Sequence, residues 1–137
     1  MKSLIVALLL TSSAALAQSM QPGLWQANTR LDLNGIPLPA SEAEECISSE
    51  DAKDVKKTIS KELSKKGCEI TKWTLKNKKL DATLKCQSKD LEAEGSLKGT
   101  VTEKSYELTG SAEGSFKGIP SAAGLQLKGK WVRVCKN

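Results

Sequence analysis

The sequence predicts a mainly β, α+β fold: a curled antiparallel sheet or open barrel of about seven to eight short strands with one inserted helix. Three observations support this class. Apolar and polar residues alternate over most of the chain, turn residues such as Asn34-Gly35 separate the alternating runs, and one early segment has apolar residues at helical spacing. A two-sheet β-sandwich is the alternative architecture.

The first predicted strand covers residues 23–33, where Trp25 belongs to an apolar face that recurs at every second residue. Pro37 and Pro39 follow the turn and prevent a regular central strand there, because proline cannot donate a ladder hydrogen bond. A second strand is predicted from about residue 43 to 47.

A helix is predicted next, between Ser48 and Gly67. Ser48 and Asp51 have the spacing of a capping box, and Gly67 is placed to end the helix. The apolar stripe at helical spacing consists of Ala52, Val55, Ile59 and Leu63. We expect this helix to cover one side of the sheet and to show its charged side to water.

A hairpin follows over residues 68–75 and 80–86. With the turn centred on Asn77, Cys68 lies opposite Cys86, at a separation that a disulfide can bridge. The same alternation places Trp73 on the face opposite Ile70, together with Thr71 and Leu75.

The longest alternating runs, residues 91–101 and 106–116, predict a second hairpin with a turn near residues 102–105. Residues whose numbers sum to 207 then pair, and large residues face small ones, as in Leu97 with Gly110. Glycine is costly within a strand, so its recurrence on one face predicts sharp curvature or close approach of another layer. Residues 119–124 are predicted to form a loop and residues 125–134 the last strand.

Four cysteines allow three pairings. If Cys68 pairs with Cys86, the second disulfide joins Cys46 to Cys135 and ties the early part of the domain to its last strand. A metal site is the competing interpretation, but the chain has neither a CxxC spacing nor histidine, which disfavours zinc. We therefore predict two structural disulfides, as in exported domains of this size.

The N-terminus predicts export. Lys2 precedes an apolar run, and Ala15-Leu16-Ala17 has the pattern of a cleavage site. Residues 1–17 are therefore a predicted signal peptide and residues 18–137 a single domain, located in the periplasm or secreted, with no transmembrane anchor after cleavage. A buried N-terminal helix is the alternative for this segment.

Short motifs carry a resemblance to a known family. Residues 22–25 read PGLW, residues 46–51 read CISSED, and residues 132–135 read VRVC. In this order they resemble the bacterial family of domains of unknown function numbered 3617, small exported proteins with a PGLW start, a C-x-(S/T)-x-E-D segment and a terminal cysteine. Residues 36–39 (IPLP) stand where many members have a Met- and Pro-rich loop. The resemblance implies export and a shared fold, and no established activity.

Several classes of chemistry are disfavoured. Histidine is absent, which excludes His-based triads and His-ligated metals, and the formal charge, +5 before and +4 after loss of Lys2, is mild for a nucleic-acid-binding protein. After residue 17 there is no Gly-x-Ser-x-Gly or Ser-x-x-Lys motif. The nearest candidates for acid–base work are Glu42, Glu44, Glu45, Asp90, Glu92 and Glu94, and the last three alternate with an apolar face and so point to solvent. We expect a non-enzymatic protein without cofactor or metal.

Two sets of residues are candidates for binding. The apolar set could line a concave site for a slender ligand, or could simply fill the core: Trp25, Trp73, Trp131, Leu97 and Leu108. The basic set could contact an anionic surface, or could be a solvated charged end: Lys65, Lys66, Lys72, Lys76, Lys78 and Lys79.

The resulting hypothesis is a periplasmic binding module for a small apolar or amphipathic ligand or an envelope component. The alternative is a protein–protein interaction or structural envelope factor, such as an inhibitor or an assembly accessory, without a small-molecule site. A cavity lined by Leu97, Leu108 and tryptophan would favour the first hypothesis, whereas a filled interior with an exposed tryptophan patch would favour the second.

Overall fold

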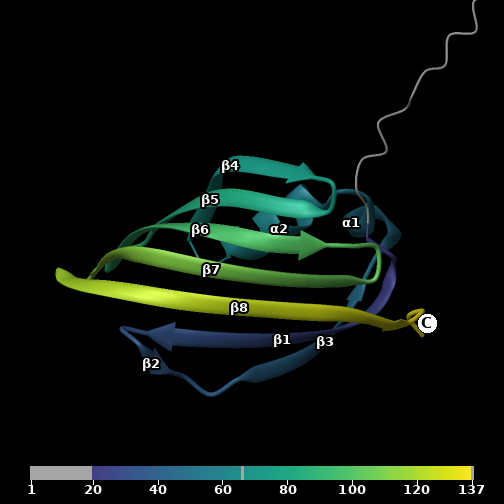
Figure 1. The fold of residues 1–137 in the computed structure, drawn as a ribbon, viewed down its shortest axis with the longest axis horizontal. Helices are drawn as coiled ribbons and strands as arrows, with labels where there is room; N and C mark the ends of the chain where they lie inside the picture. The colour runs from purple at the N-terminus through teal and green to yellow at the C-terminus, as the bar shows by residue number, and fades with distance from the viewer. Residues whose placement is uncertain (1–19, 66, 137) are drawn as a thin grey trace, which may run out of the picture.

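A computed structural model describes residues 20–65 and 67–136, so the predicted signal peptide lies outside the described residues. Within them the chain forms one open antiparallel sheet of eight strands, in the order β2-β1-β8-β7-β6-β5-β4, with β3 paired to β1 (Figure 1). The strands are β1 (Gly23–Leu33), β2 (Ile36–Pro37), β3 (Ser41–Ile47), β4 (Cys68–Lys76), β5 (Lys79–Gln87), β6 (Leu91–Val101), β7 (Ser105–Phe116) and β8 (Ile119–Arg133). The predicted curled sheet is confirmed. It does not close into a barrel and does not split into a sandwich.

Two short helices replace the single predicted helix. These are α1 (Ser49–Lys53) and α2 (Val55–Ser64), and the break falls at Asp54, whose φ of −129° and ψ of 89° are not helical. Ser48 caps α1 by accepting a hydrogen bond from the Asp51 backbone N–H at 3.2 Å, as predicted. Asp54 caps α2 in the same way, accepting from the Lys57 N–H at 3.0 Å.

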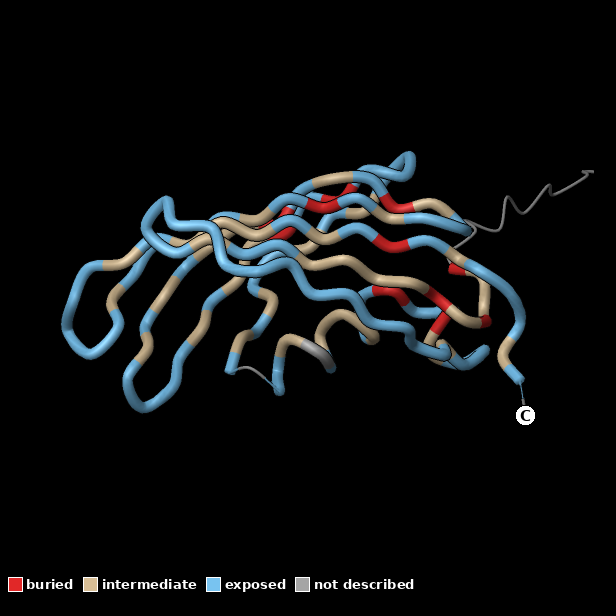
Figure 2. Tube along the Cα trace, turned by 90° about the horizontal axis from the view of Figure 1, so that it is seen from below, coloured by how far each residue is buried: buried red, intermediate tan, exposed pale blue. Residues whose placement is uncertain are grey.

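The core lies between the helices and one face of the sheet, which we call the inner face. The buried residues include Trp25 of β1, Leu97 of β6 and Leu108 of β7, which meet Ala52 and Val55 from the helices. In Figure 2 the buried positions gather in the part of the sheet above the helices, while the far ends of the strands extend beyond them. The helices therefore cover only part of the inner face.

The predicted pairing of β6 with β7 is confirmed, with Leu97 opposite Gly110 and Leu91 opposite Phe116. The glycines mark a sharp bend between these strands. A Cβ at Gly114 would meet the Glu92 carbonyl oxygen and lie 2.6 Å from the Cα of Ala93. Since that Cβ would point to the inner face, the neighbouring backbone rises on this side, and the sheet is concave there. This is the curvature that the strand glycines predicted.

The loop predicted at residues 119–124 is wrong, because β8 begins at Ile119 and pairs with β7 from its first residue. Pro120 is tolerated there because β1 ends at Leu33, opposite Ala123, and leaves the start of β8 paired on one side only. The last strand is thereby both longer than predicted and central, lying between β1 and β7.

Both predicted disulfides are present: Cys46–Cys135 joins β3 to the segment after β8, and Cys68–Cys86 joins β4 to β5. The β4–β5 turn is formed by Asn77 and Lys78, both with left-handed φ, so its centre lies half a residue beyond the predicted one. A bulge between Ile70 and Lys72 restores the predicted pairing at Cys68.

The same bulge corrects the predicted direction of Trp73. It places Ile70 and Trp73 on the same face, where both are half-buried, whereas Thr71 is exposed. The prediction that Trp73 and Ile70 lie on opposite faces is therefore wrong, because simple alternation does not count an extra residue.

Candidate ligand-binding face

The apolar residues singled out from the sequence lie mostly in the core. Trp25 is 1% exposed, and its indole N–H donates to the Gln21 carbonyl at 2.8 Å. Leu97 and Leu108 are buried beside it. These three side chains fill the interior under the helices instead of lining a cavity for a ligand.

The other two tryptophans are half-buried and pack against this core. Trp131 pairs with Trp25 across β1 and β8, donates to the Pro22 carbonyl at 3.1 Å, and has the Lys104 ammonium 5.3 Å from its ring centroid. Trp73 contacts the core from β4, at the edge of the sheet. The tryptophans thus do not form one exposed patch.

Tyr106 completes the aromatic group. Its ring stacks on Trp25 at a centroid distance of 5.9 Å and lies across Gly129, where a Cβ would meet the ring. Burial raises the pKa of Tyr106, and the nearby Glu45 carboxylate raises it further. The phenol is therefore neutral at physiological pH and contributes packing.

Beyond the helices the inner face remains apolar and open. Of the eight large apolar side chains that are exposed among the described residues, six belong to this end: Leu31, Leu33, Ile36, Leu38, Phe116 and Ile119. We call the region formed by Leu31, Leu33, Leu91, Phe116, Ile119 and Leu125, with the small residues between them, the open apolar face. All six point to the same side of the sheet as the core residues of their strands, because each lies an even number of residues away from one of them.

Small residues run through the middle of the open apolar face. Leu33 is opposite Ala123, Ala123 is opposite Ala112, and Ala112 is opposite Gly95. In the next row toward the strand ends, Ser121 is opposite Gly114 and Gly114 is opposite Ala93. In these rows the three neighbouring strands β6, β7 and β8 therefore carry only small side chains. The bend between β6 and β7 turns this part of the sheet into a shallow channel.

Positive charge lies at the outer end of the channel. The ammonium of Lys117, in the β7–β8 turn, lies 5.4 Å from the Phe116 ring centroid. The Lys117 backbone N–H donates to the Asp90 carbonyl at 2.7 Å, which joins this turn to the β5–β6 turn that carries Lys89. The two turns at this end of the sheet thus carry two exposed lysines, Lys89 and Lys117, and one exposed aspartate, Asp90.

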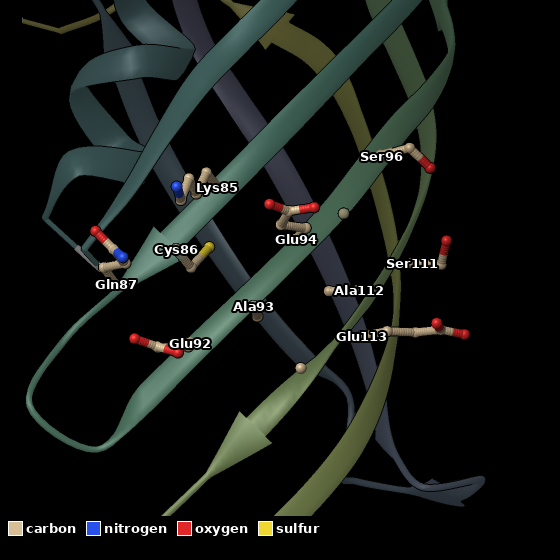
Figure 3. Close-up of a pocket in the computed structure, with 12 residues that line it drawn as sticks. Lys85, Cys86, Gln87, Glu92, Ala93, Glu94, Ser96, Ser111, Ala112 and Glu113 are labelled. Carbon is tan, nitrogen blue, oxygen red and sulfur yellow. The ribbon is translucent and has the colours of Figure 1, made fainter.

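A shallow hollow of about 670 Å³ crosses β5, β6 and β7 at the same bend. Its alanine and glycine residues have the inner-face alternation, whereas its serines and its charged residues, among them Lys85, Glu94 and Glu113, have the opposite alternation. Figure 3 shows the carboxylates of Glu92, Glu94 and Glu113 pointing in different directions. The acids of this hollow do not converge as a general acid–base pair would.

A model of the family "Protein of unknown function (DUF3617)" matches residues 20–135. The chain belongs to the DUF3617 family. The resemblance inferred from the short motifs is thereby confirmed. Neither the curated proteins nor the solved structures contain a significant match.

The described part of this DUF3617 chain, residues 20–65 and 67–136, contains no helix that is both long and apolar enough to cross a membrane. Over the same residues there is no group of three acidic, cysteine or histidine side chains placed to hold a metal ion.

The predicted basic set does not form one cluster. Lys65 caps the end of α2, next to the start of β4, whereas Lys76, Lys78 and Lys79 lie at the other end of that strand. Nine residues of strand separate these ends by about 26 Å. Lys72 lies between them on β4, and Lys66 lies outside the described residues.

The residues of the open apolar face are not predicted as a site by the sequence pattern. Leu31 and Leu33 belong to the predicted apolar face of residues 23–33, and the predicted β6–β7 register pairs Leu91 with Phe116, but nothing in the alternation distinguishes covered from uncovered positions. The missing information is where the helices end. Because α2 ends at Ser64, it does not reach the outer ends of β7 and β8.

Proposed function

We propose that this protein is an exported, non-enzymatic binding module that takes a small apolar or amphipathic ligand on the open apolar face. The gathering of exposed large apolar side chains at one end of the inner face carries this proposal. Leu33 is 44%, Phe116 49% and Ile119 66% exposed. Soluble proteins normally scatter such residues singly, and a contiguous group marks an interaction surface.

Concavity favours a ligand over a flat protein partner. The bend between β6 and β7 places small residues at the bottom and larger ones such as Leu33 and Leu91 along the sides. Ligand sites are concave and mainly apolar, with a few polar groups at defined places. Lys117 and Lys89 at the channel end supply such groups.

The two disulfides support a location outside the cytoplasm, and together with the N-terminal pattern they support the periplasm. Disulfides form and persist in oxidising compartments and are rare in the cytosol. The diverging carboxylates of Glu92, Glu94 and Glu113 support binding rather than catalysis.

The test is native mass spectrometry of the full chain, expressed with its own N-terminal segment in an exporting bacterium and isolated from the periplasm. The expected result is a small apolar species at one-to-one stoichiometry, released on denaturation. Recovery of bare protein, or of a stoichiometric protein partner instead, would overturn the proposal, and the partner would favour an envelope interaction factor.

A pair of variants locates the site. Leu33→Ser changes an exposed apolar residue within the open apolar face, and Val132→Ser changes one of similar exposure, 40%, outside it. We expect only Leu33→Ser to lose the bound species. Equal loss in both variants would mean that the ligand is held elsewhere.

A further inference from the structure

We propose that the ligand is an anionic amphiphile with one unbranched hydrocarbon chain, bound with its chain along β7 and its head group beside Lys117. This inference rests on the proposed function and specifies the class of molecule that the open apolar face accepts. Three features of the channel carry it: its floor of small residues beside the bend, its closed inner end and its positively charged outer end.

The floor is the β7 backbone. Gly110, Ala112 and Gly114 follow one another on the inner face of this strand. On β6, Gly95 and Ala93 flank them, and a Cβ at Gly95 would meet the Ser111 carbonyl and lie 3.0 Å from the Cβ of Ala112. Neighbouring strands are about 4.8 Å apart. Because the β6 backbone rises beside β7 at the bend, it forms one side of the channel, and a hydrocarbon chain laid along β7 contacts β6 on that side and the small residues Ser121 and Ala123 of β8 on the other.

The inner end of the channel is closed by the core. Leu97 lies opposite Gly110, and Leu108 follows on the same side of β7; both are buried. From Gly110 to Gly114 the floor runs about 13 Å, since a strand rises about 3.3 Å per residue. An apolar chain terminus therefore belongs at Gly110, against the core.

The outer end of the channel selects the head group. Beyond Gly114, the exposed ring of Phe116 has the Lys117 ammonium beside it, at 5.4 Å. Lys89 stands on the adjoining turn, and Asp90 is the single acid of the two turns. A carboxylate or phosphate head group placed here meets net positive charge at the point where the apolar floor ends.

The first experiment is a titration of the purified full-length mature protein with unbranched fatty acids of increasing chain length. The affinity is expected to rise by up to about fourfold per added methylene, which follows from about 0.8 kcal/mol per buried methylene. It should level off once the chain exceeds the length of the channel. An affinity independent of chain length would overturn the proposed orientation.

The second experiment fills the channel. Ala123→Leu adds bulk on the inner face, whereas Ala122→Leu adds the same bulk to the next residue, which is exposed on the other face. Displacement of about two methylenes predicts roughly fifteenfold weaker fatty-acid binding for Ala123→Leu and no change for Ala122→Leu. Ser121→Leu, in the following row of the channel, provides an independent variant should Ala123→Leu not fold. Unchanged binding in a folded channel variant would overturn the inference.

The third experiment tests the head group. Lys117→Glu should weaken fatty-acid binding and leave binding of the corresponding uncharged alcohol unchanged. Lys76→Glu is the matched control, because it makes the same charge change at the opposite end of the sheet. Equal effects of the two variants would show that only net charge matters and would refute the assigned position of the head group.

The neutral dye Nile red separates this inference from the proposed function. If Nile red binds and Ala123→Leu weakens its binding while fatty acids do not bind, the binding face stands and the assigned ligand class fails. If neither the dye nor fatty acids bind, the proposed function itself fails. Binding of both, with competition between them, supports both.

Discussion

The two disulfides should differ in how much they stabilise the protein, and the difference follows from their positions in the chain. Cys46–Cys135 spans 89 residues and Cys68–Cys86 spans 18. In the chain-entropy description, a crosslink stabilises by removing conformations of the unfolded chain, more so for a longer loop. The relation gives about 4.6 kcal/mol for the long loop and about 3.2 kcal/mol for the short one at 25 °C.

The perturbation is replacement of each pair by serine, in two separate double variants. Urea unfolding followed by far-ultraviolet circular dichroism gives the free energy of unfolding of each variant and of the parent. We expect the variant without Cys46–Cys135 to lose about 1.4 kcal/mol more than the variant without Cys68–Cys86. The reverse order, with unchanged denaturant slopes, would refute the argument from loop length.

Three further predictions concern the core, the bend and the pH dependence. Leu97→Ala should lower the free energy of unfolding by about 2–5 kcal/mol, because Leu97 is buried in the core. Leu33→Ala, at an exposed position of the open apolar face, should lower it far less and should weaken ligand binding instead. Equal losses of stability in urea unfolding would contradict this prediction. Gly114→Ala should destabilise by about 1–3 kcal/mol and Gly110→Ala by less, because only the former Cβ would overlap the neighbouring backbone; thermal melts test the order. The pKa of Tyr106 is raised in the folded state, so its contribution to the free energy of unfolding is fully present below the unfolded pKa of 10.0 and is lost as pH rises through the folded pKa. The free energy of unfolding should therefore fall less steeply at alkaline pH in Tyr106→Phe than in the parent. Identical dependence on pH in the two proteins would argue against this.

The β6–β7 hairpin could be predicted from the sequence to the residue, because two long alternating runs leave one register that keeps their apolar sides together. The glycines were informative for another reason: glycine is costly within a strand, so the recurrence of Gly95 and Gly114 on one face predicted curvature or close approach of another layer, and the structure has the curvature. The disulfide pairing followed from the short hairpin around Asn77.

Other features depend on backbone choices that leave no clear trace in the pattern. The bulge after Ile70 adds one residue to a strand, and the sequence around it still alternates acceptably without the bulge. The helix break at Asp54 interrupts an apolar stripe that is continuous in the sequence. For the candidate site, the alternation of apolar residues identified the inner face of the sheet. How much of that face the helices cover depends on where α2 ends and where the chain turns back at Gly67.

The central place of β8 has a consequence for biosynthesis. This strand is the last to emerge from the ribosome among those described, yet it joins β1 on one side and β7 on the other. The segment from β4 to β7 is a meander of adjacent hairpins, and β1 pairs locally with β2 and β3, whereas the other edge of β1 must wait for β8, about a hundred residues downstream. Completion of the sheet is therefore a late, long-range step, during which the nascent chain depends on protection from aggregation.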